Sequence, residues 1–112
     1  MITYEREIEH YSERCGGKGT MHIERLLPPE ILKDHVKMYA KVTIDVASSL
    51  GYHEHIGDGE SYYILSGKAL YNDNGKEVEL SAGACTYTED GCGHAIANIG
   101  DEPLVFMAVI LK

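Results

Sequence analysis

The stretch Gly51-Tyr-His-Glu-His-Ile-Gly-Asp-Gly-Glu60 decides how the rest of the chain is interpreted. Side chains alternate between the two faces of a β-strand, so His53 and His55 are expected to point to the same side. The glycine-rich turn that follows can reverse the chain, and Glu60 then opens the next strand beside the histidines. Two imidazoles and a carboxylate on one face predict the start of a metal site, and His94 is the best candidate for a further ligand.

Short apolar stretches separated by turn residues fill the chain from residue 36 onward. Val42, Ile44 and Val46 alternate with polar residues, which is typical of a half-buried strand. Asn72-Asp-Asn-Gly75 predicts a hairpin turn. We expect strands at 21–27, 40–46, 62–65, 68–71, 76–80, 84–88, 94–99 and 104–111, and one helical turn at 30–34. Many short strands with almost no helix predict an all-β sandwich or small barrel.

The last apolar run, Leu104 to Leu111, is expected to be buried on both faces, and a partner subunit could cover one of them. We divide the domain into an N-terminal arm with strands that pack on the barrel, residues 1–35, and a barrel core, residues 36–112. The first segment contains a glycine-rich loop, Gly16-Gly17-Lys18-Gly19. A phosphate-binding role and a purely structural role both remain open for this loop, because the hydroxyl residue of a P-loop is absent.

Composition excludes several functional classes. The chain has 112 residues, 44% of them hydrophobic and 25% charged, which suits one soluble domain. Its net charge of −8 repels a phosphate backbone, so nucleic acid is not an expected partner. No apolar run approaches the length of a membrane span, and no signal peptide is recognised. Three cysteines, without a CxxC pair, predict reduced thiols in a cytoplasmic protein.

The two motifs together resemble those of the cupin superfamily. The first is His53-x-His55-x4-Glu60-x6-Gly67, and the second is Gly83-x5-Glu89-Asp90-Gly91-x2-His94-x3-Asn98. The resemblance covers residues 36–111 and is nearest to small single-domain bacterial cupins. Three positions that shape turns differ from the family pattern: they are Ala47, Ala84 and Glu89. The resemblance implies a double-stranded β-helix, a jelly-roll barrel that forms a homodimer and holds one metal inside.

The family pattern implies His53, His55, Glu60 and His94 as metal ligands. Three imidazoles and one carboxylate suit a divalent transition metal (Mn, Fe, Co, Ni, Cu or Zn) better than Ca or Mg. Four protein ligands leave two octahedral positions for water or substrate, whereas a tetrahedral zinc would be saturated and structural. The remaining histidines, His10, His22 and His35, are expected to lie outside the site.

Residues around the ligands are weaker candidates. The pocket residues that we predict share a strand face with the ligands or lie on the neighbouring apolar strand. They are Tyr62, Ile64, Ile96, Val42 and Ile44, with Val46 beside them. We expect Cys85 to be a small buried residue and Asn98 to be a structural hydrogen-bonding residue, whereas a reactive Cys92 near the pocket mouth is the less favoured alternative for that residue. Four further tyrosines have no predicted direction: Tyr52, Tyr63, Tyr71 and Tyr87.

The leading functional hypothesis is a metal-dependent enzyme that acts on a small oxygenated molecule, such as a sugar derivative or a carboxylic acid. The metal would activate this molecule as a Lewis acid, and isomerisation, lyase chemistry, decarboxylation and dioxygenation are all reactions that such a metal can support. No catalytic residue is evident from the sequence. Two alternatives stay open: a non-catalytic module that binds a sugar or metabolite with the help of the metal, and a barrel with a structural zinc.

Overall fold

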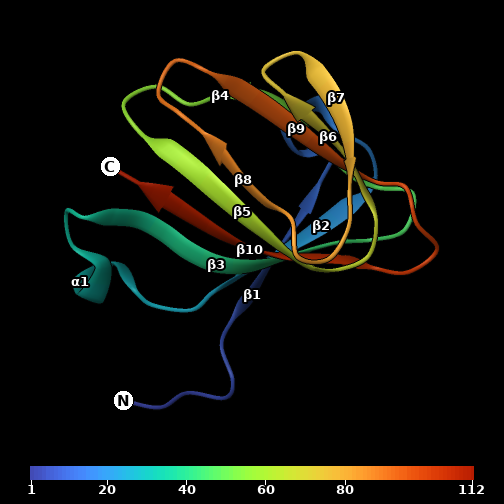
Figure 1. Cartoon of the computed structure of the whole chain (residues 1–112). Coiled ribbons are helices and arrows are strands. Elements are labelled where there is room, and N and C mark those ends of the chain that lie inside the picture. Colours follow the sequence, from blue (N-terminus) through green and yellow to red (C-terminus); the bar gives the residue numbers. More distant parts are fainter.

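The computed structural model describes all residues, 1–112, and is built almost entirely of β-strands (Figure 1). The strands are β1 (Ile8–Ser12), β2 (Thr20–Arg25), β3 (Val36–Ile44), β4 (Ser49–Glu54), β5 (Gly59–Ser66), β6 (Ala69–Asp73), β7 (Lys76–Leu80), β8 (Cys85–Thr88), β9 (Gly93–Asn98) and β10 (Leu104–Leu111). Two short helical turns, η1 (Arg14–Gly16) and α1 (Pro29–Leu32), complete the chain. Neither helix is long and apolar enough to cross a membrane.

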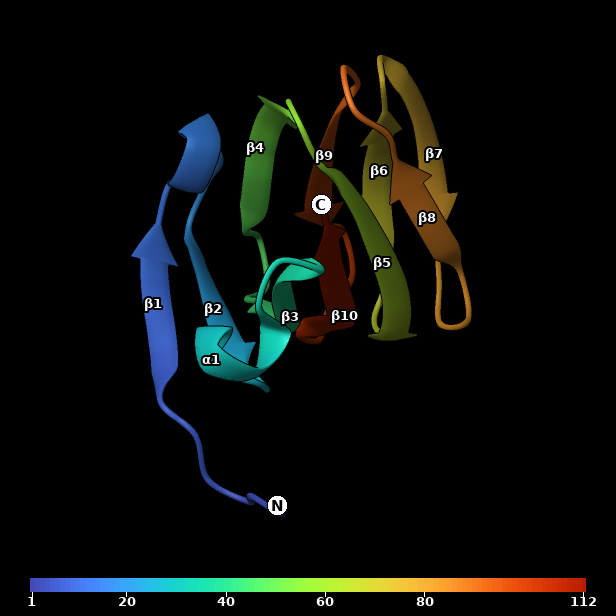
Figure 2. The ribbon, with the colours of Figure 1, turned by 90° about the vertical axis from the view of Figure 1, so that its left-hand side faces the viewer.

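Two antiparallel sheets form the body of the protein (Figure 2). The larger sheet has the order β1-β2-β3-β10-β5-β8, and the smaller has the order β4-β9-β6-β7. Strands that follow one another in sequence often lie in different sheets, as β4 and β5 do, which is typical of a jelly roll. This arrangement confirms the predicted double-stranded β-helix. Strands β1 and β2 extend the larger sheet beyond β3, while the division at residue 36 stays a prediction.

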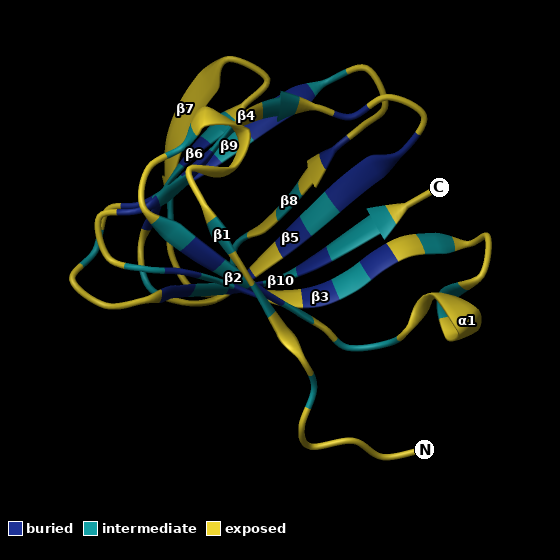
Figure 3. Ribbon diagram, turned by 180° about the vertical axis from the view of Figure 1, so that it is seen from behind, coloured by how far each residue is buried: buried dark blue, intermediate teal, exposed yellow.

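The core lies between the sheets, where the alternation of side chains brings one face of every central strand inward (Figure 3). Leu104, Phe106 and Ala108 of β10 are fully buried there. The Phe106 ring packs 4.4 Å from the ring of Tyr62, measured between centroids. Asn98 Nδ2 donates hydrogen bonds to the carbonyls of Ile44, Asp45 and Glu102. This confirms its structural role.

Two expectations about burial were wrong, and a third is not tested by the single chain. Strand β3 ends at Ile44, so Val46 lies in the turn that follows and is 49% exposed. Cys85 is exposed because it points away from the core on the edge strand β8. Within the single chain strand β10 is buried on its inner face, and Val105, Met107 and Val109 are half-buried on the outer face of the larger sheet, so cover of that face by a partner stays a prediction.

Candidate metal centre

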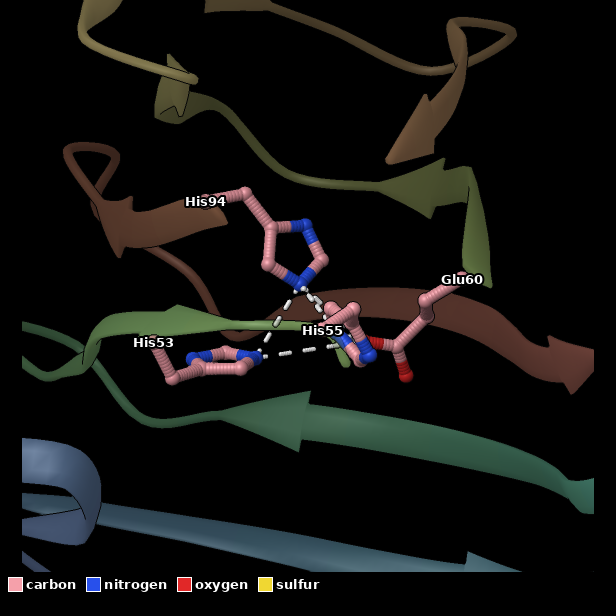
Figure 4. Close-up of side chains that lie close together, drawn as sticks. All are labelled: His53, His55, Glu60 and His94. Atoms are coloured by element: carbon pink, nitrogen blue, oxygen red, sulfur yellow. Dashed lines mark hydrogen bonds and ion pairs between the residues drawn. The ribbon is translucent and has the colours of Figure 1, made fainter. Parts of the chain in front are cut away.

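Four predicted ligand residues converge at one end of the barrel interior. His53 lies on β4, His55 just after it, His94 on β9 and Glu60 on β5, so both sheets contribute (Figure 4). His53 and His94 are direct partners in the β4–β9 register. One nitrogen or oxygen atom from each residue lies within 4.8 Å of the others.

The converging atoms are close enough to share one ion. His94 Nε2 lies 3.0 Å from His53 Nε2 and 3.1 Å from His55 Nε2. Glu60 Oε1 lies 3.0 Å from His55 Nε2, 3.1 Å from His94 Nε2 and 3.9 Å from His53 Nε2. Metal–ligand bonds of about 2.1 Å place neighbouring octahedral ligands about 3.0 Å apart and tetrahedral ligands about 3.4 Å apart. The separations of 3.0–3.1 Å match neighbouring octahedral positions, whereas the 3.9 Å between Glu60 Oε1 and His53 Nε2 is longer than either geometry predicts for neighbouring ligands.

The other nitrogen of each imidazole has its own hydrogen-bond partner. His53 Nδ1 donates to the Gly51 carbonyl at 2.9 Å, and His55 Nδ1 donates to Asp58 Oδ1 at 2.8 Å. Because a protonated Nδ1 leaves Nε2 as a bare lone pair, these bonds fix the tautomer that a metal needs.

The His94 ring is held in the same way inside the barrel. Its Nδ1 lies 2.8 Å from the Tyr71 hydroxyl and 3.0 Å from the Thr88 hydroxyl, which are 3.0 Å from each other. His94 is completely buried, so these hydroxyls are the hydrogen-bond partners of its Nδ1, and they accept from it when that nitrogen carries the ring proton. All three Nε2 atoms therefore face the Glu60 carboxylate, and with the proton of each neutral ring on Nδ1 they would form a donor set that a cation satisfies.

Electrostatics keep Glu60 ionised. Burial alone would raise its pKa, but hydrogen bonds with His53 and His94 outweigh burial and lower the pKa to about 2. Burial lowers the pKa of His94, which keeps that imidazole neutral. Burial also lowers the pKa of His53, but its contact with Glu60 more than compensates, and the net shift is upward. A carboxylate and neutral imidazoles are the forms that bind metal.

A cavity of about 160 Å³ ends on this cluster. His53, His55 and Glu60 lie in its lining, and apolar side chains supply most of the rest. These apolar and aromatic residues are Met21, Ile23, Met38, Val42, Leu50, Tyr62, Phe106, Ala108 and Ile110. The Tyr62 ring stacks on His94, and burial raises the pKa of its phenol well above the usual range. Arg14 and Cys15 complete the lining.

The predicted pocket residues divide into two groups. Tyr62 and Val42 line the cavity, whereas Ile44, Ile64 and Ile96 are buried in the core away from it. Sequence reasoning missed Asp58, Tyr71 and Thr88, which hold the imidazoles, and Arg14 and Cys15. Asp58, three residues after His55 in the turn, was the only one with a local signal in the sequence.

The other histidines and cysteines lie elsewhere. His10 and His22 contact each other on neighbouring strands, with 2.7 Å between their Nδ1 atoms, and His22 also contacts Asp45. His35 is exposed, and Cys92 is half-buried and does not line the cavity. Of the four undirected tyrosines, Tyr71 points inward, and Tyr52, Tyr63 and Tyr87 are exposed.

Comparison with known proteins identifies the class that this fold and site define. The family model described as "Cupin domain" matches residues 40–110. The chain therefore belongs to the cupin domain family, as its two motifs indicated.

Individual relatives show a more specific likeness. An oxalate-binding protein of Thermotoga maritima is 38% identical over 113 residues, which cover 99% of this chain and 93% of that protein. A crystal structure from T. maritima, described as a predicted oxalate decarboxylase, superposes with a TM-score of 0.95 at 37% identity and covers 99% of this chain and 98% of that one. An oxalate decarboxylase of Bacillus subtilis is 35% identical over 75 residues, 62% of this chain but only 20% of that enzyme.

Proposed function

We propose that this protein binds a small carboxylate, with oxalate as the first ligand to test, at a divalent transition metal held by His53, His55, Glu60 and His94. The observation that carries the proposal is the convergence of three imidazole Nε2 atoms and one carboxylate oxygen at the end of an apolar cavity. Four protein ligands on an octahedral ion would leave two coordination positions for a ligand, whereas a tetrahedral zinc would be closed. When bound, the metal would supply the positive charge that attracts the carboxylate of the small-molecule ligand.

The size of the cavity favours a small acid over a sugar derivative. Ligand pockets for larger metabolites usually measure about 300–1,000 Å³. A cavity of about 160 Å³ is close to those that hold benzene, a molecule of about six non-hydrogen atoms. Oxalate has about the same number of atoms, and the name of the T. maritima relative supports the same class of ligand.

The lining favours binding over turnover. Decarboxylation of the oxalate monoanion gives formate and carbon dioxide, and a proton must reach the carbon that loses carbon dioxide. Apart from the four ligand residues, the lining has no carboxylate or imidazole, which are the usual proton-transfer groups. The phenol in the lining is that of Tyr62, and burial raises its pKa. The lining also holds the exposed Cys15, but its two imidazoles, His53 and His55, are assigned to the metal and would not be free to activate a thiol.

The test begins with metal-free protein. The protein is loaded in turn with Mn²⁺, Fe²⁺, Ni²⁺ and Zn²⁺, its metal content is measured, and oxalate is added in a calorimeter. We expect one metal per chain and one oxalate per metal, with both absent in the His53→Ala/His55→Ala double variant. A metal-loaded wild type that releases no heat with any small carboxylate contradicts the proposal.

Oxalate decarboxylation is the second candidate, because the B. subtilis relative that shares this motif region is such an enzyme. The same metal-loaded samples distinguish the two functions by the formate and carbon dioxide produced in the presence and absence of oxygen. Formate production that exceeds one turnover per metal favours the enzyme, while binding without formate favours the binding protein.

We further propose a homodimer that forms through the outer face of the larger sheet. The register places Met107, Tyr63 and Cys85 side by side across β10, β5 and β8. Tyr63 and Tyr87 are 47% and 56% exposed, and a contiguous apolar sheet face is typical of an interface. Light scattering tests the mass, and Tyr63→Lys should give monomers.

The three unpaired cysteines support a reducing compartment such as the cytoplasm.

A further inference from the structure

The loop between β1 and β2 borders the mouth of the cavity. It contains the turn η1 and the glycine-rich residues whose role the sequence left open. Arg14 and Cys15, at its start, line the cavity together with His53, His55 and Glu60. A loop in this position can contribute to ligand recognition even though it lies far from both motifs in the sequence.

Close backbone contacts hold this loop against β4. The Ser49 N–H donates to the Lys18 carbonyl at 2.8 Å, and the Lys18 N–H donates to Ser49 Oγ at 2.9 Å. A Cβ on Gly17 would lie 2.2 Å from the Ser49 carbonyl oxygen, and one on Gly51 would lie 1.9 Å from the Cys15 carbonyl oxygen. Only glycine permits this approach, which fixes the loop two residues before a candidate ligand.

The Arg14 guanidinium has no anionic partner. Arg6 pairs with Glu24 at 2.8 Å, and Arg25 pairs with Glu9 at 2.7 Å. Arg14, by contrast, forms no ion pair and no side-chain hydrogen bond; its Cζ lies 4.0 Å from the centroid of the Tyr11 ring. Stacking on an aromatic ring orients a guanidinium and leaves its N–H donors free.

Arg14 shares its cavity with the metal cluster. The lining that includes Arg14 also includes His53, His55 and Glu60. A cation without an ion-pair partner thus borders a mainly apolar cavity that ends on the metal cluster.

We propose that Arg14 determines specificity at this site by binding the distal carboxylate of a small dianion, such as a dicarboxylate, whose other end binds at the metal cluster. The inference rests on the proposed function. A divalent ion with the Glu60 carboxylate carries one net positive charge, which a monoanion neutralises. The second charge of a dianion would be costly in an apolar cavity unless paired, and a guanidinium binds a carboxylate through two parallel hydrogen bonds.

The experiment compares a dianion with a monoanion on Mn²⁺-loaded protein. Oxalate and acetate affinities are measured by calorimetry for wild type, Arg14→Gln, Arg14→Lys and Lys18→Gln. The last is a matched control, because Lys18 belongs to the same loop and carries the same charge but does not line the cavity. Metal content is measured before and after each titration, since oxalate itself chelates divalent metals.

We expect Arg14→Gln to retain its metal, to bind oxalate about tenfold to a hundredfold more weakly, and to bind acetate as wild type does. Arg14→Lys should lose less oxalate affinity than Arg14→Gln, because it keeps the charge without the planar fork. Lys18→Gln should bind both anions as wild type does.

Three results would overturn the assignment. Wild-type oxalate affinity in Arg14→Gln would remove Arg14 from the binding site and leave the proposed function intact. Equal losses of affinity for oxalate and acetate in Arg14→Gln would refute the idea that Arg14 selects a dianion over a monoanion. A metal-loaded wild type that binds neither anion would refute the inference and the proposed function together.

Discussion

Removal of both hydroxyls that contact His94 should weaken metal binding far more than removal of either one. Tyr71 and Thr88 both lie within hydrogen-bond distance of His94 Nδ1, and His94 is completely buried. In Tyr71→Phe or Thr88→Val the remaining hydroxyl still accepts the proton, so we expect losses of less than about tenfold. In the double variant a buried N–H has no partner, which costs about 1–3 kcal/mol, or roughly fivefold to 150-fold in metal affinity.

The assay is a competition titration with a chelating fluorescent indicator on wild type, both single variants and the double variant. Thr43→Val serves as the control, because Thr43 alternates with buried residues of β3 and lies on the outer face. Thermal unfolding of the metal-free proteins checks that each variant folds. Losses that simply add, or a double variant with wild-type affinity, would refute the idea that the two hydroxyls share the His94 proton.

Three further predictions concern stability, and each is measured by denaturant unfolding of the metal-free protein. Ala47 has φ 59°, so Ala47→Gly should raise the free energy of unfolding by about 0.5–1 kcal/mol; a decrease would show that this turn is not strained. Phe106→Ala removes a fully buried ring and should cost about 3–5 kcal/mol, whereas a cost below about 1 kcal/mol would contradict the packing described for the core. The folded pKa of Glu60, about 2, lies below its ordinary value of 4.5, so its contribution of about 3 kcal/mol is complete above pH 4.5 and is lost as the pH falls toward 2. Glu60→Gln should remove this part of the pH dependence of stability. Identical pH profiles of stability for the variant and the wild type would exclude this contribution of Glu60.

The sequence predicted the elements whose causes are local. Strand alternation places His53 and His55 on one face, and the following turn returns Glu60 to the same region. The position of His94 came from the spacing of the second motif, and the register pairs it directly with His53. The hairpin at 72–75 follows from its turn residues, and β6 and β7 flank it.

Contacts between distant segments could not be predicted from the sequence. Ile64 does point inward, as its strand position indicated, but a rise of about 3.3 Å per residue places it roughly 13 Å along β5 from Glu60. Alternation identifies the face of a strand and not its depth in the barrel. Tyr71 reaches His94 because β6 pairs with β9, and Arg14 reaches the cavity because two glycines let its loop lie on β4.

The ligand residues belong to both sheets, and this has a consequence for the motions of the barrel. His53 and His94 lie in the smaller sheet, and Glu60 lies in the larger one. An ion bound among them would join the two layers by strong directional bonds, beside the hydrogen bonds that Thr88 of the larger sheet already makes with Tyr71 and His94 of the smaller one. Separation of the layers would then require release of the ion, so amide hydrogen exchange in β5 and β9 would slow as free metal increases, in proportion to occupancy. The supply of metal in the cell would thus set how long this small barrel stays closed.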